Sequence, residues 1–168
     1  EQQQWSTMCD AAGMAVYQRC GELQVPVGIM CFQGLSLHYD DILRFLQEAP
    51  STTLILDHFG FTAIDDDNAF QKLLQLAQYP AVHVKISAPF RLKDPSPYKR
   101  VYEKRFLPLL DAFGADQLLY GSDFPFALEQ PEAYKMHTLV ASWCPDETTR
   151  TAILGGTTER LFGPWGSK

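Results

Sequence analysis

Short apolar runs alternate along this chain with segments of helical spacing. Four of the runs are typical of strands buried on both faces, as in a parallel sheet; they cover residues 24–32, 52–59, 81–88 and 117–124. Apolar positions at helical spacing predict helices over residues 10–23, 39–49, 66–78, 97–113, 132–143, 147–154 and 157–162. Strands that alternate with helices indicate an α/β fold with a parallel sheet and right-handed crossovers.

The spacing of these units predicts part of a barrel. A strand with its helix recurs about every 30 residues, as in βαβ units, and four units make half of an eight-unit barrel of about 250 residues. With 168 residues and no sign of a second domain, residues 1–168 are predicted to form a single partial domain. A half barrel leaves two sheet edges open. We therefore expect another copy, another chain or the N-terminal half of a longer protein to complete it, and Glu1 in place of Met favours a processed or truncated start.

Charge and composition exclude some classes of partner. The net charge of −6 and the isoelectric point of about 5.1 argue against nucleic-acid binding. No apolar stretch approaches the roughly 20 residues of a membrane span, and no signal peptide is visible. The cysteines have no metal-binding spacing, which favours free thiols in a reducing compartment; they are Cys9, Cys20, Cys31 and Cys144.

Two of the predicted strands end in ionisable residues. His58 follows the second apolar run and Asp123 the fourth, at the carboxyl ends of strands, where α/β folds build their sites. A histidine there can bind a metal or polarise a substrate carbonyl, and an aspartate can activate water as a general base or bind a metal. Two structural interpretations stay open: His58 forms a local hydrogen bond, and Asp123 forms a turn or caps a helix before Pro125.

Three basic residues are candidates for binding a substrate. Arg91 directly follows the third run, and a guanidinium can hold a carboxylate at two points. Six of the 14 basic residues lie between positions 91 and 105, which indicates an anionic substrate, although all except Arg91 better suit a solvated face. Lys85 lies inside the third run and points either into a barrel centre or between sheet and helices. His38 follows the first run, either on the rim near His58 or at the start of a helix.

A pair of glycines lies near the end of the chain. Gly155 and Gly156 directly precede Thr157. This pattern predicts the end of one helix and the start of the next, with Thr157 as the cap. Its spacing does not match that of phosphate-binding glycine loops.

Four stretches of the sequence, in order, resemble the amidohydrolase-related family of TIM-barrel hydrolases. They are residues 56–60, 84–91, 114–125 and 153–162, and residues 21–30 also fit the approach to a barrel strand. The family includes 2-pyrone-4,6-dicarboxylate lactonase and aminocarboxymuconate semialdehyde decarboxylase, and the chain is most similar to its plant, algal and cyanobacterial members. The resemblance implies the C-terminal half of a TIM barrel, strands five to eight. It also implies a protein of the cytoplasm or the plastid stroma that is not secreted.

The resemblance also implies roles for three residues. His58 takes the place of the family's strand-six histidine, and Asp123 that of the strand-eight aspartate. In lactonase-like members this aspartate activates water without a metal, whereas in decarboxylase-like members the two residues bind a divalent metal such as zinc. Arg91 falls where the lactonase holds a substrate carboxylate. Two family features are missing: no His-x-His motif occurs in this sequence, and Phe126 stands where lactonase relatives often have a histidine.

These observations lead to one main hypothesis and two alternatives. The main hypothesis is a hydrolase in which water attacks the carbonyl of a small, carboxylated lactone, ester or amide. Asp123 is the expected base, and His58 polarises the carbonyl. The expected substrate contacts are Arg91, Lys85 and His38. The alternatives are an inactive half barrel that serves as an assembly subunit or homo-oligomer, and a decarboxylase with one divalent metal, such as zinc, at His58 and Asp123.

Overall fold

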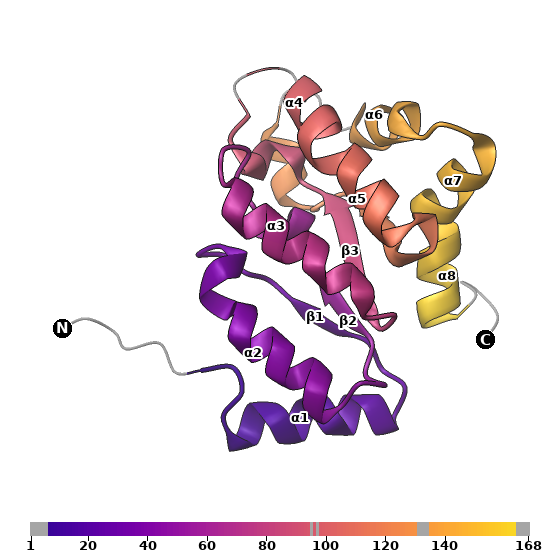
Figure 1. The fold of residues 1–168 in the computed structure, drawn as a ribbon. Coiled ribbons are helices and arrows are strands. Elements are labelled where there is room, and N and C mark those ends of the chain that lie inside the picture. The colour runs from indigo at the N-terminus through magenta and orange to yellow at the C-terminus, as the bar shows by residue number, and fades with distance from the viewer. Residues whose placement is uncertain (1–6, 95, 97, 131–134, 164–168) are drawn as a thin grey trace.

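Four short strands form one parallel sheet, in which they lie in the same order as in the chain, β1-β2-β3-β4 (Figure 1). This computed structural model describes residues 7–94, 96, 98–130 and 135–163. The strands are β1 (Val27–Ile29), β2 (Leu54–Leu56), β3 (Val82–Ser87) and β4 (Leu118–Gly121). Each lies inside a predicted apolar run, so the predicted α/β fold with parallel (β/α) units is confirmed.

The order of the strands decides where the helices lie. Each crossover moves one position in the same direction, and right-handed crossovers of this kind place the connecting helices on one face of the sheet. This is the arrangement of a (β/α) barrel, whereas a doubly wound sheet has helices on both faces. The helices α2 (Leu35–Glu48), α3 (Asp67–Gln75) and α5 (Leu107–Phe113) lie side by side over that face (Figure 1).

The remaining helices lie at the ends of the strands or beside the edge strand β4 (Figure 1). In chain order they are α1 (Ala11–Glu22), α4 (Lys99–Val101), α6 (Met136–Trp143), α7 (Glu147–Thr151) and α8 (Thr157–Phe162). α1 lies below the amino ends of β1 and β2 (Figure 1), where the Tyr17 hydroxyl donates to the Thr52 carbonyl oxygen. The prediction for residues 132–143 is confirmed from Met136 onward, and residues 131–134 lie outside the described part.

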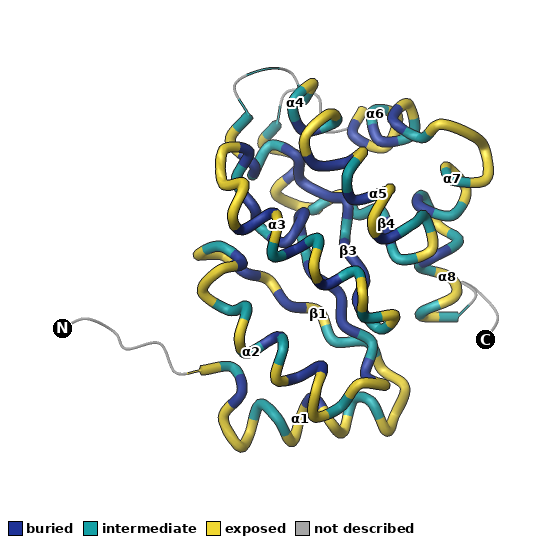
Figure 2. The backbone as a smooth tube through the Cα atoms, viewed as in Figure 1, coloured by how far each residue is buried: buried dark blue, intermediate teal, exposed yellow. Residues whose placement is uncertain are grey.

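The core lies between the sheet and the helices. Alternate residues of the strands point toward the helices and are completely buried; they are Leu54, Leu56, Val82, Val84, Ile86 and Leu118. They pack in one cluster with Leu46 of α2, Leu73 of α3 and Leu109 of α5. Figure 2 shows β3 as largely buried, whereas the edge strand β1 is partly exposed. Because each such side chain contributes about 1.5–3 kcal/mol on burial, the core holds the strand ends in fixed positions.

The opposite face of the sheet carries polar side chains. The register pairs residues on this face: Ile55 with His83, Lys85 with Leu119, and Ser87 with Gly121. Lys85 therefore points away from the helices. Of the two orientations that the sequence left open, the structure has the one toward the barrel centre.

The second helix begins earlier than predicted. α2 starts at Leu35 instead of residue 39, because Leu35 is completely buried and Gly34, with a φ of 97°, turns the chain directly before it. A φ in this range is readily adopted only by glycine. His38 consequently lies in the first turn of α2, half-buried.

The two glycines near the end of the chain do not separate two helices. α7 continues through a π-helical turn, Ala152–Gly156, into α8 without a break. The prediction that Thr157 caps a helix is wrong, because Thr157 is completely buried and its Oγ1 donates to the Ala115 carbonyl oxygen at 3.3 Å. A similar π-helical turn, Tyr102–Phe106, joins α4 to α5.

One residue of the predicted solvated basic face is buried. Arg105 is 1% exposed, and its guanidinium lies over the ring of Phe70, 4.3 Å from Cζ to the ring centre. Its Nη2 donates to the Ala63 carbonyl oxygen at 2.8 Å. The prediction of solvation is therefore wrong for Arg105, because a long side chain can bury its stem and stack its planar head on an aromatic ring.

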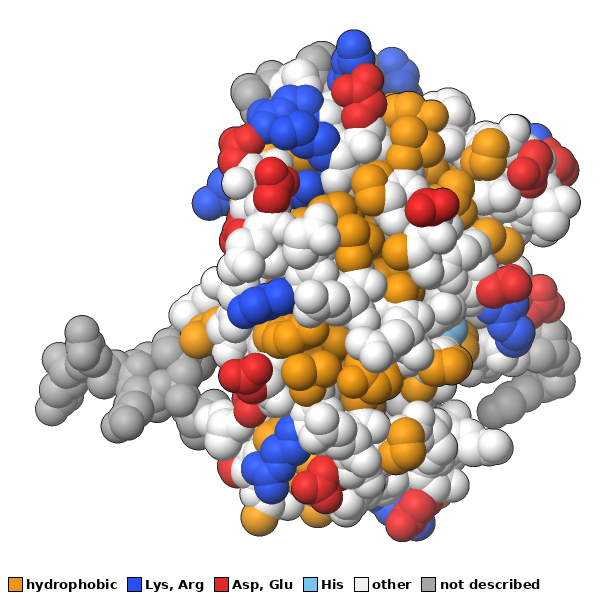
Figure 3. All heavy atoms as spheres, viewed as in Figure 1, with side chains coloured by type: hydrophobic (Ala, Val, Ile, Leu, Met, Phe, Trp, Pro, Cys, Tyr) orange, Lys and Arg blue, Asp and Glu red, His pale blue; other side chains and the backbone are white. Residues whose placement is uncertain are grey.

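Charges of both signs are mixed on the helical side of the molecule. Figure 3 shows Lys and Arg side chains next to Asp and Glu side chains there, with hydrophobic side chains between them. Among the residues that the structure describes, no helix has the length and apolar character needed to cross a membrane.

Gly21, near the end of α1, gives a test of the packing between α1 and the sheet. A Cβ at this position would lie 2.2 Å from Thr52 Oγ1 and 3.3 Å from Thr52 Cβ. Thr52 is completely buried and has little room to move. We expect Gly21→Ala to lower the free energy of unfolding by about 1–3 kcal/mol, as overpacking does, although alanine normally stabilises a helix relative to glycine. Urea unfolding followed by circular dichroism measures this change.

Gly155→Ala is the matched control. A Cβ at Gly155, also in a helical segment, meets nothing within 4 Å. We expect this substitution to raise the free energy of unfolding by about 0.5–1 kcal/mol. If both substitutions stabilise the protein, the close approach of Gly21 to Thr52 is wrong.

Candidate active site

His58 lies directly after β2 and is 3% exposed. The strand ends at Leu56, and the chain then turns through His58–Phe61 with left-handed backbone at His58 and Phe59, whose φ angles are 52° and 54°. Non-glycine residues in this conformation are strained, and they cluster at functional sites. The imidazole Nδ1 lies 2.7 Å from Oγ of Ser87, at the end of β3. This contact fixes the plane of the ring.

Asp123 follows β4 and contacts one residue that follows β2 and one that follows β3. Its Oδ2 accepts a hydrogen bond of 2.8 Å from Nε of Arg91, and its Oδ1 lies 3.4 Å from Nε2 of His58. The Asp123 side chain is 9% exposed, and its φ of 61° is also left-handed. Arg91 comes from the turn Pro89–Leu92 after β3. Three residues predicted from strand ends are thus in contact, supplied by three adjacent strands.

Burial keeps His58 neutral. Loss of solvent lowers the pKa of His58 below its ordinary value of 6.5, although the nearby carboxylates of Asp123 and Asp57 act in the opposite direction. The buried Nε2 of His58 has no hydrogen-bond partner among the described residues. The 3.4 Å separation from Asp123 is too long for a good hydrogen bond. Nε2 is therefore available to a substrate beside Asp123.

Ser87 orients His58 and allows two roles for it. If the Ser87 hydroxyl donates to Nδ1, the ring proton is on Nε2, which can then donate to a carbonyl oxygen. If Nδ1 donates to Ser87, Nε2 presents a lone pair, as a metal requires. A hydroxyl serves both arrangements, so the structure fixes the ring and leaves its tautomer to the ligand.

An ion pair lies on the inner face beside this site. Nζ of Lys85 contacts Oδ1 of Asp57, the residue before His58. Gly121 gives Lys85 room, because a Cβ there would lie 2.8 Å from Lys85 Cδ.

Burial, together with the charge of Asp57, raises the pKa of the Cys31 thiol to about 12. Cys31 therefore stays protonated and does not suit a nucleophile.

A hollow lined by aromatic and basic side chains lies beside Arg91. It encloses about 470 Å³, and its lining includes Phe32, Phe61, Phe90, Arg91, Lys93 and Phe126. A second hollow of about 350 Å³ shares Phe32, Phe61, Arg91 and Lys93 with the first. Both lie at the carboxyl ends of the strands, and their size suits a small-molecule ligand.

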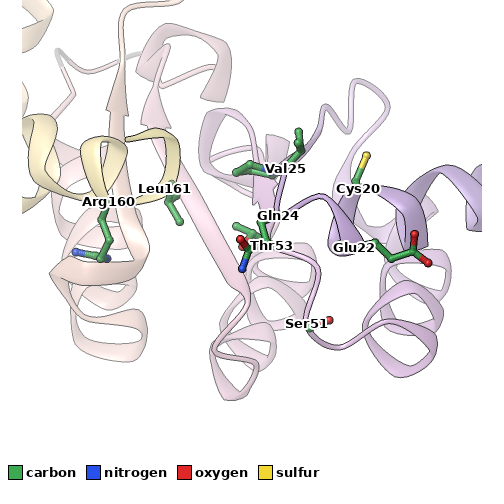
Figure 4. A pocket seen from close by; sticks show the side chains of 10 residues that line it. Cys20, Glu22, Gln24, Val25, Ser51, Thr53, Arg160 and Leu161 are labelled. Carbon is green, nitrogen blue, oxygen red and sulfur yellow. The ribbon is translucent and has the colours of Figure 1, made fainter. Parts of the chain in front are cut away.

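A further hollow of about 630 Å³ lies at the opposite end of the sheet (Figure 4). Arg160 and Leu161 of α8 line one side, and Cys20 and Glu22 of α1 line the other. Its strand-side residues precede the strands, so it lies at the amino ends, where barrel residues serve stability more than catalysis. We therefore place the candidate active site at the carboxyl ends.

The predicted site residues fall into three groups. The structure brings His58, Arg91 and Asp123 together. Lys85 lies on the same inner face but pairs with Asp57. His38 lies in α2 and is not among the side chains that line the two hollows beside Arg91. The roles of all five in catalysis or substrate binding stay predictions.

Sequence reasoning missed Ser87 as the partner of His58. A signal was present, because strand alternation places Ser87 on the same face as Lys85, closer to the carboxyl end. The phenylalanines around Arg91 had no such signal. They come from loops after different strands, which only the folded sheet brings together.

His58 and Asp123 are also the predicted metal ligands. The unpartnered Nε2 and the neighbouring carboxylate suit two positions of a zinc site. Catalytic zinc takes three protein ligands, and in the part of the chain that the structure describes no three His, Cys, Asp or Glu side chains gather at one point. Arg91 also already holds Asp123. The described residues therefore do not form a complete zinc site.

Comparison with known proteins places the chain in a family. A family model described as Amidohydrolase matches residues 2–163. The chain belongs to the amidohydrolase family. The chain is 30% identical to the L-fucono-1,5-lactonase of Burkholderia multivorans over an alignment of 138 residues, which covers 73% of the chain and 47% of that relative. It is also 32% identical to the 4-sulfomuconolactone hydrolase of Rhizobium radiobacter. That alignment of 121 residues covers 67% of the chain and 40% of the relative. The chain spans less than half the length of these two curated relatives.

Solved amidohydrolase structures share its fold. One from Burkholderia multivorans, solved with bound zinc, has a TM-score of 0.75 at 27% identity, covering 90% of this chain and 57% of that chain. A protein described as a 2-pyrone-4,6-dicarboxylic acid hydrolase from Pseudomonas putida has a TM-score of 0.76 at 24% identity, covering 96% and 60%. The resemblance to the TIM-barrel amidohydrolases, and the fold that it implies, are confirmed.

Two buried histidines predict how the stability of this chain depends on pH. Burial lowers the pKa of both His58 and His83 below the ordinary value of 6.5. Below that pH the unfolded chain binds protons that the folded chain does not, so acid favours unfolding. We expect the free energy of unfolding to decrease as pH falls from about 6.5, by at most about 1.4 kcal/mol per pH unit for each histidine.

Urea unfolding between about pH 7.5 and 5.5 measures this dependence, above the range in which most carboxylates titrate. His83→Gln should make the slope shallower, whereas the exposed His137→Gln should leave it unchanged. A slope that is the same in the unmodified protein and in His83→Gln would show that His83 does not contribute to it.

Proposed function

We propose that this amidohydrolase opens the ring of a small, carboxylated lactone by attack of water on its carbonyl carbon, with Asp123 as the general base. The observation that carries the proposal is the contact of Asp123 with both His58 and Arg91 at three adjacent strand ends. The names of the two curated relatives, an L-fucono-1,5-lactonase and a 4-sulfomuconolactone hydrolase, support a lactone as substrate.

Asp123 moves the proton in both halves of the reaction. It accepts a proton from water as the water oxygen bonds to the carbonyl carbon. The C–O bond of the ring then breaks, and the protonated Asp123 returns the proton to the leaving oxygen. The product is an open-chain hydroxy acid, and the Asp123 carboxylate is restored.

His58 stabilises the charge that develops on the carbonyl oxygen. In the tautomer with the proton on Nε2, the ring donates to that oxygen from the side facing Asp123. Because burial keeps the ring neutral, His58 does not add a second positive charge to that of Arg91 beside Asp123. Ser87 holds the ring in this orientation through Nδ1.

Arg91 serves both the base and the substrate. Its contact with Asp123 uses Nε, one of the five N–H donors of a guanidinium. The terminal nitrogens suit a substrate carboxylate in the hollow that Arg91 lines. Lys85 stays a proposed second contact for a substrate that reaches the inner face, and His38 stays a proposed contact at the rim.

Further (β/α) units complete the site in this proposal. In the described sheet β1 and β4 each pair on one side. Exposed apolar side chains flank both strands: Val25, Met30 and Phe32 beside β1, and Phe124 and Phe126 beside β4. Strands from the N-terminal half of a longer protein, or from a second chain, would pair with these edges. The native mass of the purified protein distinguishes the two sources.

Hydrolysis of a panel of carboxylated lactones by the full-length protein tests the function. Acid release at constant pH follows ring opening, with and without added zinc. Turnover by the unmodified protein that is lost in the Asp123→Asn variant supports the proposal. If the unmodified protein hydrolyses no lactone of the panel, the proposal is rejected.

A further inference from the structure

Arg105 is a buried cation that the proposed reaction does not use. It is 1% exposed and lies in the π-helical turn Tyr102–Phe106 that joins α4 to α5. Single π-helical turns inside helices are frequent at functional sites. Nη2 of Arg105 donates at 2.8 Å to the carbonyl oxygen of Ala63, which lies between the His58–Phe61 turn and α3. Arg105 therefore joins the connection after β3 to the loop that follows His58.

The burial of Arg105 does not depend on the open edges of the sheet. Its guanidinium stacks on the ring of Phe70 and lies 3.5 Å from Oδ1 of Asp67, both in α3. α3 connects β2 to β3, and α5 connects β3 to β4, and the two helices lie side by side (Figure 1). Strands that pair with β1 or β4 extend the sheet at its edges, so they leave this contact between two helices as it is.

The turn that carries His58 has an unfavourable backbone. Four successive residues have left-handed φ angles: 52° at His58, 54° at Phe59, 64° at Gly60 and 53° at Phe61. Glycine adopts this conformation readily, whereas each of the other three costs free energy. A strained segment of this kind persists only where the surrounding structure holds it. The turn therefore requires contacts that fix its exit as firmly as β2 fixes its start.

Two hydrogen bonds between distant parts of the chain fix this exit. One is the bond from Arg105 to the Ala63 carbonyl oxygen. The other is the backbone bond of 2.9 Å from Ile64 N to the carbonyl oxygen of Leu92, in the turn that also carries Arg91. The Arg105 bond has a charged donor, which makes it the stronger kind. It is also the one made by a side chain, so a substitution can remove it.

We propose that Arg105 is a positioning residue for the reaction: by holding the Ala63 carbonyl it closes the left-handed turn and fixes the imidazole of His58 beside Asp123. The inference adds a residue to the proposed function and rests on it. Arg105 does not line either hollow beside Arg91. It therefore acts through the turn and not through contact with the substrate.

Hydrogen exchange tests the closure of the turn without any substrate. Arg105→Met keeps an apolar stem over Phe70 and removes the donor to Ala63. We expect the amides of residues 58–64 to exchange about tenfold faster, because loss of a charge-assisted hydrogen bond favours local opening. The amides of β3 should exchange as before. Mass spectrometry of the full-length protein measures both segments, and unchanged exchange in residues 58–64 would overturn the inference.

Steady-state kinetics tests the consequence for the reaction. Arg105→Met is expected to lower kcat by about 10–100-fold, since a displacement of about 1 Å in a catalytic group has an effect of this size. KM should change less, because Arg91 keeps its place beside the substrate. Unchanged kcat in a folded Arg105→Met protein would overturn the inference.

A double variant shows whether Arg105 acts through His58. In a His58→Gln protein the imidazole is already absent, so adding Arg105→Met should lower kcat by less than about twofold. A residue with a merely structural role would lower kcat by the same factor in both backgrounds. That result would overturn the positioning role.

Arg100→Met is the matched control. Arg100 lies five residues earlier and pairs with Asp65 in the same loop, but the Asp65 side chain is 75% exposed. An exposed ion pair contributes little to stability. The control should therefore leave both kcat and the exchange of residues 58–64 unchanged. Equal effects of Arg100→Met and Arg105→Met would show that the loss of positive charge, and not of the bond to Ala63, is the cause, and would overturn the inference.

Thr62→Val keeps the inference testable if Arg105→Met does not fold. Thr62 is completely buried, and its Oγ1 donates to the Phe59 carbonyl oxygen at 2.9 Å, within the same turn. Valine has nearly the same shape and no donor. We expect faster exchange of residues 58–64 and a lower kcat. Faster exchange with unchanged kcat would overturn the inference, because an open turn would then still position His58.

The two proposals fail separately. Faster exchange of the turn in Arg105→Met, without hydrolysis of any lactone by the unmodified protein, would reject the proposed function alone. Hydrolysis of lactones by the unmodified protein, with unchanged exchange and kcat in Arg105→Met, would reject the role of Arg105 alone.

Discussion

Replacing Asp123 with asparagine is expected to lower kcat for lactone hydrolysis by about 10²–10⁴-fold, the usual contribution of general base catalysis. Asparagine has nearly the same shape, and its oxygen can still accept the hydrogen bond that Arg91 Nε gives to Oδ2. It cannot take a proton from water. KM should change much less than kcat, because Asp123 acts on the water and not on the substrate carboxylate. Steady-state kinetics separates the two parameters.

Asp116→Asn provides the matched control for this experiment. The Asp116 carboxylate is 83% exposed and pairs with Arg160 at the other end of the sheet. Its loss should leave kcat within about twofold of the unmodified protein, as for a surface substitution. Thermal unfolding of both variants shows whether they are folded. A folded Asp123→Asn variant with unchanged kcat would contradict the role of Asp123 as base.

Replacing His58 with glutamine is expected to lower kcat by about 10²–10³-fold, the loss that follows removal of one donor to a developing oxyanion. The imidazole contacts Ser87 through Nδ1 and faces Asp123 through Nε2. A glutamine amide cannot place a fixed ring between these two groups, so the donor to the carbonyl oxygen is lost or misplaced. The kcat of the variant with the best lactone substrate measures the effect.

His137→Gln is the control, because His137 is exposed on α6. It should retain normal kinetics. The double variant of His58 and Asp123 should lose less than the product of the two single losses, since residues that act as a unit are not additive. If His58→Gln retains full kcat, carbonyl polarisation comes from another group.

The arrangement of strands and helices could be predicted from the sequence, but the lengths of the strands could not. The third apolar run, residues 81–88, exceeds β3, Val82–Ser87, by only one residue at each end. The first run spans residues 24–32, yet β1 covers only Val27–Ile29. Hydrophobicity reports burial, whereas strand pairing also requires a neighbouring strand in register. Apolar residues beyond the paired segment are buried or exposed without belonging to the sheet.

The predictions for one helix boundary and for one basic residue were wrong, because packing between distant parts of the chain overrides the local sequence signals. The glycines before Thr157 are typical of a helix end, yet the helix continues because Thr157 and Ile153 are completely buried there. Arg105 has the pattern of a solvated residue, but its guanidinium stacks on Phe70 of α3. Both outcomes depend on partners about 40 residues away in the chain, or on a packed core, that local propensity does not include.

The sequence by itself determined that His58, Arg91 and Asp123 lie at the carboxyl ends of strands, because apolar runs that switch to ionisable residues mark those ends. It also determined the barrel type of fold, through the regular alternation of strands and helices. Only the tertiary structure decided that these residues touch, that Ser87 orients His58, and that four phenylalanines line the same space. The reason is geometric: the parallel register brings together loops that are about 30 residues apart in sequence, and a single sequence shows the loops but not their contacts.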